Sequence, residues 1–411
     1  MRVFGLSSRY VRRLSLYPRF PFVPAFCLVA TLGLLGAGLV LEGCERKGGK
    51  GELVAPAQGK VRHVRKAPAD TDPADAMRVH FINVGQGDAT LLEFPCGVIV
   101  IDTGGEMNEA FDGERAYREY LENFFDSRPD LGRKIDLLAI THPHIDHTRS
   151  VEWTLENLSV RNLLDNGQVV EDDPGSPPQE HMVAWADSHK GVGHHSVAAA
   201  DIPADEGWSD DIIDPISSCT RGATDPQVRL LWGRVEDHDQ TYGQNPNDHS
   251  VVIRVDYGES SVLFTGDLQM MGLARMSKHF GAKPEVFDVD IYQVGHHGSH
   301  NATKPYFVSL MSPRLAVVSA GAYERDLDWT ARRYGHPHRK AIYPLLDADH
   351  GVSDFRESPK SVMLGVRGAW KETPSEFEEV LIERAVYATA WDGHVVVTAN
   401  SNGWIEIETE R

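Results

Sequence analysis

Four residues that commonly bind metals stand within six positions of one short stretch. His142, His144, Asp146 and His147 follow the uncharged apolar run 137–140, which predicts a buried strand. If the chain leaves the sheet in a tight loop, His142 and His144 point the same way, and Asp146 and His147 open the next segment. Imidazole nitrogens beside a hard carboxylate suit Zn²⁺, Fe or Mn²⁺. Four ligands exceed the need of one tetrahedral ion, so the stretch predicts two adjacent metals.

Three other predicted strand ends carry groups that such a site needs. Asp267 follows an apolar strand, where a single carboxylate is well placed to bridge two cations. His296 and His297 follow another, and we expect one to bind metal and the other to face substrate; their spacing does not separate them. Asp102 ends a third strand and is expected to hold the second nitrogen of a histidine or the loop backbone.

The apolar pattern predicts two sheets with helices outside them. In the first half, strands are expected at 78–84, 89–94, 97–101 and 137–140, with helices at 114–125 and 150–158. In the second half, strands are expected at 228–232, 250–257, 261–264, 288–294, 315–320, 387–388, 393–398 and 404–407, with a helix at 268–280. This order predicts a two-layer sheet sandwich with helices outside.

The segment 166–227 interrupts this pattern. It is rich in Asp and Pro and predicts a loop-rich insertion near the mouth of the site, long enough to be a functional loop or lid. Its histidines are expected to be solvated: His181, His189, His194 and His195.

The N-terminal residues 1–44 predict a targeting segment. Five arginines precede the uncharged apolar stretch 20–41, and Cys44 follows. The pattern is typical of a lipoprotein signal with Cys44 as the lipidated residue, or of an uncleaved membrane anchor. Residues 45–76 lack apolar periodicity and predict a flexible linker to a domain at 77–411. Either alternative predicts an exported chain, attached to the membrane on the periplasmic or extracellular side.

The 411-residue chain is acidic, with a formal net charge of −19. Since residues 1–44 carry five Arg and one Glu, the remainder holds −23. An acidic chain repels polyanions at long range, which disfavours tight nonspecific DNA binding unless a local basic patch or the metals override it. We find no Gly-x-Ser-x-Gly, Walker-type or dinucleotide motif, so we expect neither a serine nucleophile nor a nucleotide cofactor.

The chain resembles the metallo-β-lactamase-fold hydrolases, and within them the soluble hydrolase-like domain of ComEC-type competence proteins. The resemblance covers nearly everything from 79 to 407. It rests on seven stretches in order: Asn-Val-Gly-Gln-Gly-Asp-Ala at 83–89, Ile-Asp-Thr-Gly at 101–104, Thr-His-Pro-His-Ile-Asp-His at 141–147, Asn-Asp-His-Ser-Val-Val at 247–252, Phe-Thr-Gly-Asp at 264–267, Val-Gly-His-His-Gly-Ser at 294–299 and Tyr-Gly-His-Pro-His at 334–338.

The resemblance implies an α/β chain with the four-layer αββα sandwich of that fold, and two divalent metals, Zn or Mn. His142 and His144 would bind the first metal and Asp146 and His147 the second, with Asp267 bridging. His296 or His297 would complete the second site. Supporting roles are expected for Asp88, Asp102 and His249, and substrate contacts for Ser299, His300, His336 and His338.

Two departures from the family pattern bear on the metals. Asn83 stands where the family usually has Asp, and His249 is the only imidazole before the strand at 250–257, where the wider fold carries a metal-binding histidine. The first metal is therefore expected to be poor in ligands, or His249 to substitute.

The expected activity is metal-dependent hydrolysis. Bound metal lowers the pKa of water toward neutrality, Asp146 and Asp267 would position the nucleophile, and a free histidine, His297 or His300, would protonate the leaving group. A phosphodiester or nucleic acid is the expected substrate. The alternatives are an ester, lactone or lactam substrate in the same fold, and a non-catalytic binding module.

Overall fold

A computed structural model describes most of the compact unit Gly51–Arg411. The described residues are 61–63, 67–171, 173–217, 224–236, 245–371 and 373–411. The predicted targeting segment 1–44, with Cys44, and most of the linker 45–76 lie outside them and stay predictions. Within these ranges, the helices are all too short or too polar to cross a membrane.

The larger sheet has nine strands in the described ranges, in the order β1-β19-β18-β2-β3-β4-β7-β8-β9. Its strands β4, β7, β8 and β9 run parallel to one another, and the remaining neighbours are antiparallel. The bounds are β1 Val61–His63, β2 Ala76–Phe81, β3 Ala89–Glu93, β4 Val98–Thr103, β7 Lys134–Ala139, β8 Ser159–Asp165, β9 Gly193–Ser196, β18 Val395–Asn400 and β19 Ile405–Thr409.

The smaller sheet has six strands in the order β10-β11-β12-β13-β14-β17. β12, β13, β14 and β17 run parallel, and β10 and β11 continue the sheet antiparallel. The bounds are β10 Gln227–Trp232, β11 Val252–Tyr257, β12 Ser260–Phe264, β13 Ile291–Gln293, β14 Leu315–Val318 and β17 Val386–Ala388.

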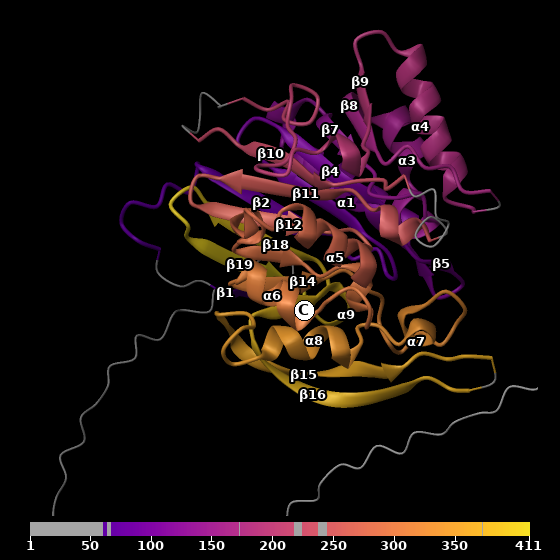
Figure 1. Ribbon diagram of the computed structural model, residues 1–411, viewed down its shortest axis with the longest axis vertical. Helices are drawn as coiled ribbons and strands as arrows, with labels where there is room; N and C mark the ends of the chain where they lie inside the picture. The colour runs from indigo at the N-terminus through magenta and orange to yellow at the C-terminus, as the bar shows by residue number, and fades with distance from the viewer. Residues whose placement is uncertain (1–60, 64–66, 172, 218–223, 237–244, 372) are drawn as a thin grey trace, which may run out of the picture. The chain divides into compact units, whose positions relative to one another are not determined.

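Helices and two hairpins surround the sheets (Figure 1). The helices are α1 Gly113–Ser127, α2 Ile145–Thr148, α3 Val151–Asn157, α4 Ser176–Ser188, α5 Met270–His279, α6 Pro305–Met311, α7 Ala331–Tyr334, α8 Arg339–Leu346 and α9 Thr389–Asp392. The hairpins are β5 Met107–Asn108 with β6 Phe111–Asp112, and β15 Phe355–Arg367 with β16 Glu376–Arg384. Short 3-10 turns lie at Pro129–Leu131, Ala199–Asp201, Pro246–His249, Pro284–Phe287 and His296–Gly298.

Alternation along the strands of the larger sheet separates two apolar layers. In β4, Ile99 and Ile101 pack between the two sheets, whereas Val98 and Val100 pack against the helices outside. Helix α1 supplies that outer layer with Tyr117, which is buried. Helices α5, α6 and α8 contribute buried apolar residues on the smaller-sheet side. The chain is therefore a four-layer αββα sandwich with the metallo-β-lactamase fold, as predicted.

The structure differs from the sequence expectations in three segments. The segment 166–227 contains helix α4, whose Pro177 and Pro178 lie in its first turn, where a missing N–H costs nothing. Residues 193–196 form an edge strand paired with β8 rather than a loop. The long β15–β16 hairpin was not predicted, because its outer face is solvated and its residues lack a continuous apolar pattern.

A buried charge network on β2 and β3 predicts a pH-dependent stability. Burial alone would raise the pKa of Glu93, but a hydrogen bond from His80 and the charges of His80, Arg78 and Arg128 lower it to about 2. The carboxylate side chain is 6% exposed. A carboxyl group whose pKa is lower in the folded state stabilises the protein above its unfolded pKa, and this stabilisation is lost as the pH falls.

Glu93→Gln is therefore expected to lower the free energy of unfolding at pH 7 by about 3 kcal/mol. The difference from wild type should shrink as the pH falls from about 4.5 toward 2. Urea unfolding at a series of pH values measures it. The solvated Glu119→Gln serves as the control, since that side chain is 64% exposed. A stability difference that stays constant through this pH range would contradict the linkage.

Candidate metal centre

Strand ends from both sheets converge on one site. In the larger sheet, β4 ends beside Asp102, and its parallel neighbour β7 leads into the loop and helix α2 that carry the histidine cluster. In the smaller sheet, β12 leads to Asp267, and its parallel neighbour β13 leads to the turn His296–Gly298. Parallel strands present their carboxyl ends at one edge, which is where open α/β sheets bind ligands.

The carboxylate of Asp267 lies at the centre of this site. Its Oδ2 is 3.4 Å from Nε2 of His147 and 3.5 Å from Nε2 of His297. The same oxygen is 3.8 Å from Nε2 of His142 and 3.7 Å from Nε2 of His296. The Asp267 side chain is 2% exposed. One carboxylate oxygen therefore faces four imidazole nitrogens.

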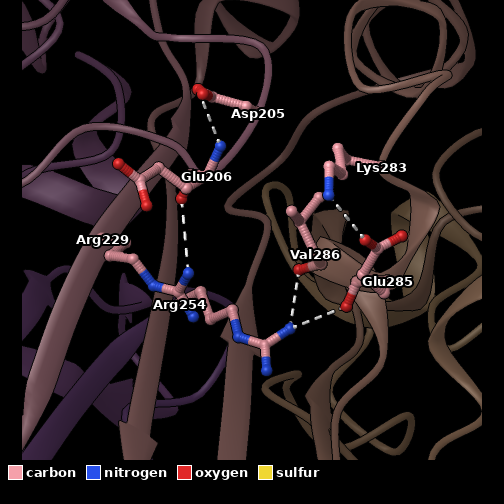
Figure 2. A pocket seen from close by; sticks show the side chains of 7 residues that line it. All are labelled: Asp205, Glu206, Arg229, Arg254, Lys283, Glu285 and Val286. Atoms are coloured by element: carbon pink, nitrogen blue, oxygen red, sulfur yellow. Dashed lines mark hydrogen bonds and ion pairs between the residues drawn. The ribbon is translucent and has the colours of Figure 1, made fainter.

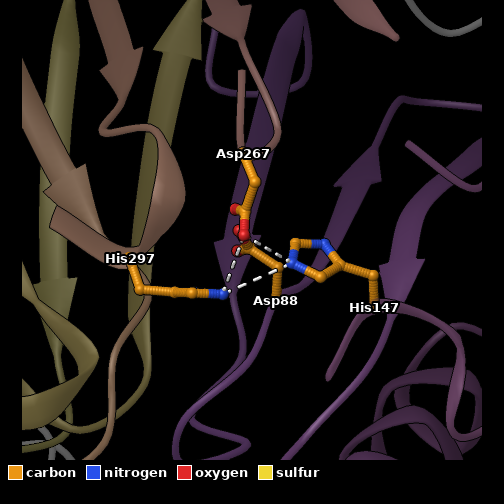
Figure 3. Close-up of side chains that lie close together, drawn as sticks. All are labelled: Asp88, His147, Asp267 and His297. Atoms are coloured by element: carbon orange, nitrogen blue, oxygen red, sulfur yellow. Dashed lines mark hydrogen bonds and ion pairs between the residues drawn. The ribbon is translucent and has the colours of Figure 1, made fainter. Parts of the chain in front are cut away.

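Two groups of ligand atoms share Asp267. One contains His147, Asp267, His297 and Asp88, and the other contains His142, His144 and Asp267 (Figure 3 shows the first). The ligand atoms within each group lie within 4.8 Å of one another. Asp146 adds an oxygen 3.3 Å from Nε2 of His297, on the side of the first group.

The hydrogen bonds fix which nitrogens face inward. His147 Nδ1 lies 2.7 Å from Asp102 Oδ2, and His297 Nδ1 lies 3.0 Å from the carbonyl oxygen of Ser319, so both Nδ1 atoms donate. In the neutral rings their Nε2 atoms then face each other at 3.3 Å with lone pairs. Two lone pairs at that distance repel unless a cation lies between them.

The second group also brings two imidazole nitrogens together. Thr141 Oγ1 donates to Asp102 and accepts from His142 Nδ1, so the His142 Nε2 lone pair faces inward. That nitrogen lies 3.0 Å from His144 Nδ1, from which it accepts a hydrogen bond when His144 carries its proton there, and the outer His144 Nε2 lies 3.6 Å from Asp173 Oδ2. The buried Asp267 Oδ1 has no hydrogen-bond partner among the described residues. Both groups therefore fit divalent metals chemically, with nitrogen and carboxylate ligands and an unmatched negative charge.

The electrostatics of the first group agree with a cation at its centre. Burial alone would lower the pKa of His147, but the charges of Asp267 and Asp102 raise it well above its usual value. For His297, burial again lowers the pKa, but the charges of Asp267 and Asp146 outweigh it and raise the pKa to about 9. Protons on these rings offset the buried carboxylates when metal is absent. Since a metal must displace those protons, its affinity is expected to rise with pH.

The pKa of His142 is shifted in the opposite direction. Burial, followed by the positive charges of His147 and His144, lowers its pKa well below the usual value. A neutral ring whose Nδ1 donates keeps the Nε2 lone pair free for a metal.

Strained backbone supports the site. Asp102, His296 and His297 have φ values of 57°, 50° and 50°, in the left-handed region that residues with a side chain seldom adopt. Such conformations persist where the surrounding structure holds them, and they concentrate at functional sites. Asp102 is further held by the N–H and hydroxyl of Thr141, both at 2.8 Å.

Asp102→Asn is expected to weaken metal binding roughly 10- to 100-fold, because an amide no longer holds His147 in the tautomer that leaves Nε2 free. Titration of the metal-free chain with Zn²⁺ against a chromogenic chelator measures this. Asp136→Asn is the matched control: Asp136 is also buried, accepts the Val98 N–H at 3.1 Å, and lies at the opposite end of β7. Equal affinity in the two variants would exclude a positioning role for Asp102.

Asp88 belongs to a ligand group, whereas only a supporting role was expected for it. Its carboxylate belongs to the first ligand group, and Oδ1 accepts from Gln293 Nε2 at 2.6 Å. Burial raises its pKa to about 6, although His297 and His147 oppose this. β3 runs antiparallel to β4, so the start of β3 lies beside the end of β4, and this pairing brings Asp88 into the site.

The expectation that His249 substitutes for a missing ligand is wrong. Its Nδ1 accepts the backbone N–H of Val235 at 3.1 Å, and its ring belongs to neither ligand group among the described residues. Asn247, two residues earlier, faces the centre instead, with Nδ2 3.2 Å from Nε2 of His296. The 3-10 turn Pro246–His249 rotates successive side chains, so only one of the two can point inward.

The structure separates His296 from His297. His297 belongs to the first ligand group, whereas His296 lies outside both groups among the described residues and donates from Nδ1 to Asn301 Oδ1 at 3.1 Å. His336 lies beside both, with ring centroids 5.8 Å from His296 and 6.4 Å from His297.

The other residues expected to contact substrate lie further out. The His300 ring packs on His338, with centroids 5.4 Å apart. His338 Nδ1 accepts the Lys340 N–H, and its Nε2 donates to the carbonyl of Val366. Ser299 is 3% exposed, and its N–H closes the turn at 296–298.

Asp173 is a supporting residue that the sequence reasoning missed. It comes from the 166–227 segment and faces the outer nitrogen of His144. Its Oδ1 accepts the N–H of Gly175 at 2.8 Å, and Thr148 Oγ1 donates to the Gly175 carbonyl, which fastens this segment to α2. The Asp-Pro-Gly turn at 173–175 was the available signal.

A separate surface hollow of about 400 Å³ lies over β10 and β11 (Figure 2). The cations that line it are paired: Arg229 and Arg254 bind Asp256, which lies outside the lining, and Lys283 lies 3.6 Å from Glu285. None of its lining residues belongs to the metal centre.

Comparison with known proteins found similar sequences and structures. Residues 82–203 match the metallo-beta-lactamase superfamily. ComE operon protein 3 of Bacillus subtilis is 27% identical over 282 residues, 65% of this chain, and competence protein ComA of Neisseria gonorrhoeae is 32% identical over 110 residues, 27% of this chain. The long form RNase Z from yeast superposes with a TM-score of 0.39 at 11% identity, covering 72% of this chain and 42% of that one.

The chain spans only part of its curated relatives, 30% of ComE operon protein 3 and 14% of ComA. The matched segment 82–203 contains the histidine cluster, and the alignment with ComE operon protein 3 extends over most of the described domain. The chain has the metallo-β-lactamase fold and resembles the ComEC-type competence proteins.

Proposed function

We propose that this chain is an exported metal-dependent hydrolase that cleaves phosphodiesters. The observation that carries the proposal is the buried Asp267 carboxylate, which two groups of closely spaced imidazole nitrogens share. A pair of adjacent metals suits in-line displacement at phosphorus, because both the attacking and the leaving oxygen need charge stabilisation.

The two metals would be held by different numbers of residues. His142, His144 and Asp267 would hold one, and Asp146, His147, His297 and Asp267 the other, with Asp88 at ligand distance. Bound Zn²⁺ or Mn²⁺ supplies a Lewis acid and lowers the pKa of water toward neutrality.

The chain's own side chains supply positioning and proton transfer. Asp146 is the most exposed of the ligand carboxylates, at 29%, so it is placed to orient an incoming water by accepting a hydrogen bond from it. Gln86 Oε1 accepts from Gly321 N–H, so its Nε2 donates to His336 Nδ1 at 3.3 Å. His336 then carries its proton on Nε2 and can donate it beside the metal centre. This replaces His297 as the proton donor, since His297 Nε2 lies in a ligand group.

The names of the relatives favour a nucleic acid among phosphodiesters, because one is a competence protein and another, from Haemophilus influenzae, is recombination protein 2. Export rests on the targeting pattern of residues 1–44 and on Cys96, which is disulfide-bonded, as is common in oxidising compartments. Membrane attachment through that segment, by a lipid on Cys44 or by an uncleaved anchor, is part of the same proposal.

The test is metal analysis of the purified full chain together with hydrolysis of bis-p-nitrophenyl phosphate and single-stranded DNA in Mn²⁺ and Zn²⁺. Two metals per chain with cleavage of both substrates is the expected result. A chain that binds metal but cleaves neither phosphodiester would instead be expected to hydrolyse esters, lactones or lactams. A chain that takes up no metal would be a binding module.

A further inference from the structure

A buried carboxylate lies behind Gln86 and has no part in the proposed function so far. Glu106 comes three residues after the end of β4, and its side chain is 0% exposed. Its Oε2 accepts the backbone N–H of Gln86 at 2.9 Å, and its Oε1 accepts from Asn108 Nδ2 at 2.7 Å. A charge that has left water needs an opposite charge and further hydrogen bonds to recover the lost hydration.

Arg325 supplies the opposite charge. Its Nη2 donates to Glu106 Oε2 at 2.9 Å, and its Nε lies 2.9 Å from Glu106 Oε1. Its guanidinium carbon lies 4.4 Å from the centroid of the Phe111 ring, and the Arg325 side chain is 17% exposed. A planar guanidinium that meets both oxygens of a carboxylate fixes the orientation of the carboxylate as well as balancing its charge.

Two glycines make room for this ion pair against the backbone. A Cβ added at Gly321 would lie 2.7 Å from Glu106 Oε2 and 2.9 Å from the backbone nitrogen of Gln86. A Cβ added at Gly85 would lie 2.6 Å from Glu106 Cβ and 2.7 Å from its Oε2. Because Cβ atoms do not approach other atoms so closely, the carboxylate fits here only beside glycines.

The side chain of Gln86 determines the tautomer of His336. Gln86 Oε1 accepts the N–H of Gly321 at 3.4 Å, which leaves Nε2 to donate to His336 Nδ1 at 3.3 Å. Gln86 and His336 are 3% and 6% exposed, so little water competes for these bonds. A neutral imidazole whose Nδ1 accepts a hydrogen bond carries its proton on Nε2.

These contacts join loops of the two sheets beside the metal centre. Gln86 and Glu106 lie in the loops after β2 and β4 of the larger sheet, and Arg325 lies in the loop after β14 of the smaller sheet. The His336 ring, to which they lead, has its centroid 5.8 Å from that of His296.

We propose that Arg325 and Glu106 are positioning residues that hold Gln86, and through it His336, so that the His336 Nε2–H donates a hydrogen bond to the leaving oxygen of the substrate. This rests on the proposed phosphodiesterase function and adds the residues that orient its proton donor. A donor at the leaving oxygen matters most for a poor leaving group, because an alkoxide develops more negative charge than a nitrophenolate does.

Two phosphodiesters with different leaving groups test the proposal in the full chain. Gln86→Met removes both hydrogen bonds of the amide and keeps a side chain of similar size. It is expected to lower kcat for the dinucleotide thymidylyl-thymidine roughly 100-fold at unchanged KM. The p-nitrophenyl ester of thymidylate needs no donor at its leaving oxygen, so its kcat is expected to change by about twofold or less.

Arg325→Gln is expected to show the same selectivity with a smaller effect, roughly 10-fold on the dinucleotide, because Gln86 keeps its bond to His336 but loses part of its support. Circular dichroism reports whether the variant folds. If the unpaired charge of Glu106 prevents folding, Arg325→Lys restores the charge without the two-pronged contact. It is expected to fold and to slow the dinucleotide alone.

The matched control is Arg254→Gln. The Arg254 side chain is 12% exposed and lies 2.7 Å from Asp256 Oδ1, beside the surface hollow that shares no residue with the metal centre. This variant is expected to hydrolyse both diesters like wild type.

The tautomer of His336 gives a readout that does not depend on hydrolysis. In ¹⁵N NMR of the histidine-labelled full chain with Zn²⁺ added, the shift of a ring nitrogen shows whether it carries a proton. His336→Gln identifies the signals of that ring by their loss. The wild-type ring is expected to carry its proton on Nε2, and Gln86→Met is expected to give a mixture of the two tautomers.

Two results would overturn the positioning role. One is an equal loss of rate with both diesters in the Gln86 and Arg325 variants, which would indicate general damage to the fold. The other is a His336 tautomer that Gln86→Met leaves unchanged. A wild-type chain that hydrolyses neither diester, while Gln86 still sets the tautomer of His336, would defeat the proposed function alone.

Discussion

Asp267→Asn is expected to remove both metals and to lower phosphodiester hydrolysis by roughly a thousandfold or more, because several kcal/mol of charge stabilisation disappear with the metals. The substitution keeps the shape of the side chain and removes its charge. Among the described residues, Asp267 alone belongs to both ligand groups, and four imidazole nitrogens lie within 3.8 Å of its Oδ2. Metal content per chain and the rate with bis-p-nitrophenyl phosphate measure the effect.

The matched control is Asp290→Asn. Asp290 is also an aspartate at a strand end of the smaller sheet, but it lies at the end opposite to the site. Its Oδ2 accepts the N–H of Ser261 at 2.9 Å. Circular dichroism of both variants reports whether the fold persists. Two metals retained in the Asp267 variant would refute the shared-carboxylate arrangement, whereas His144→Ala is expected to lose one metal and keep the other.

Gly104→Ala is expected to displace α2, to release the metal held by Asp146 and His147, and to lower the free energy of unfolding by about 3 kcal/mol. A Cβ added at Gly104 would overlap the carbonyl oxygen and the carbonyl carbon of Asp146, both well inside 3.0 Å. No side-chain rotation can relieve this overlap, because the neighbour is backbone. Metal analysis and urea unfolding measure the two effects.

Gly281→Ala is the control for the added methyl group, since its Cβ would meet its nearest neighbour, the carbonyl oxygen of Lys278, at 3.2 Å. It is expected to keep both metals. Wild-type metal content and stability in the Gly104 variant would contradict this prediction. That result would mean that the loops after β4 and β7 can move apart without loss of folding free energy, so that their close approach does not position the site.

Local sequence was sufficient for part of the site. The spacing of His142, His144, Asp146 and His147 after an apolar strand is a short-range pattern, and short loops at strand ends leave few ways to arrange it. The period-two alternation likewise predicted most strands, because residues on the two faces meet different apolar layers. Helix α4 was missed because Pro177 and Pro178 are equally typical of loops and of a first helical turn.

The roles of individual side chains depended on contacts between distant segments. Asp88 enters the ligand group because β3 pairs with β4, and His249 leaves it because its Nδ1 accepts a backbone N–H from residue 235. The distinction between His296 and His297 comes from Asn301 and Ser319, which orient the two rings differently.

The sequence by itself thus determined the metallo-β-lactamase fold, through ordered motifs at the strand ends, and the histidine cluster at 142–147, whose spacing depends on residues close together in the chain. Tertiary structure decided which nitrogen of His147 and His297 faces inward and which distant side chains hold each ring. The physical reason is that hydrogen-bond geometry and surface charge depend on neighbours in space, and the strand pairing that brings those neighbours together links residues as far apart as Asp88 and Gln293.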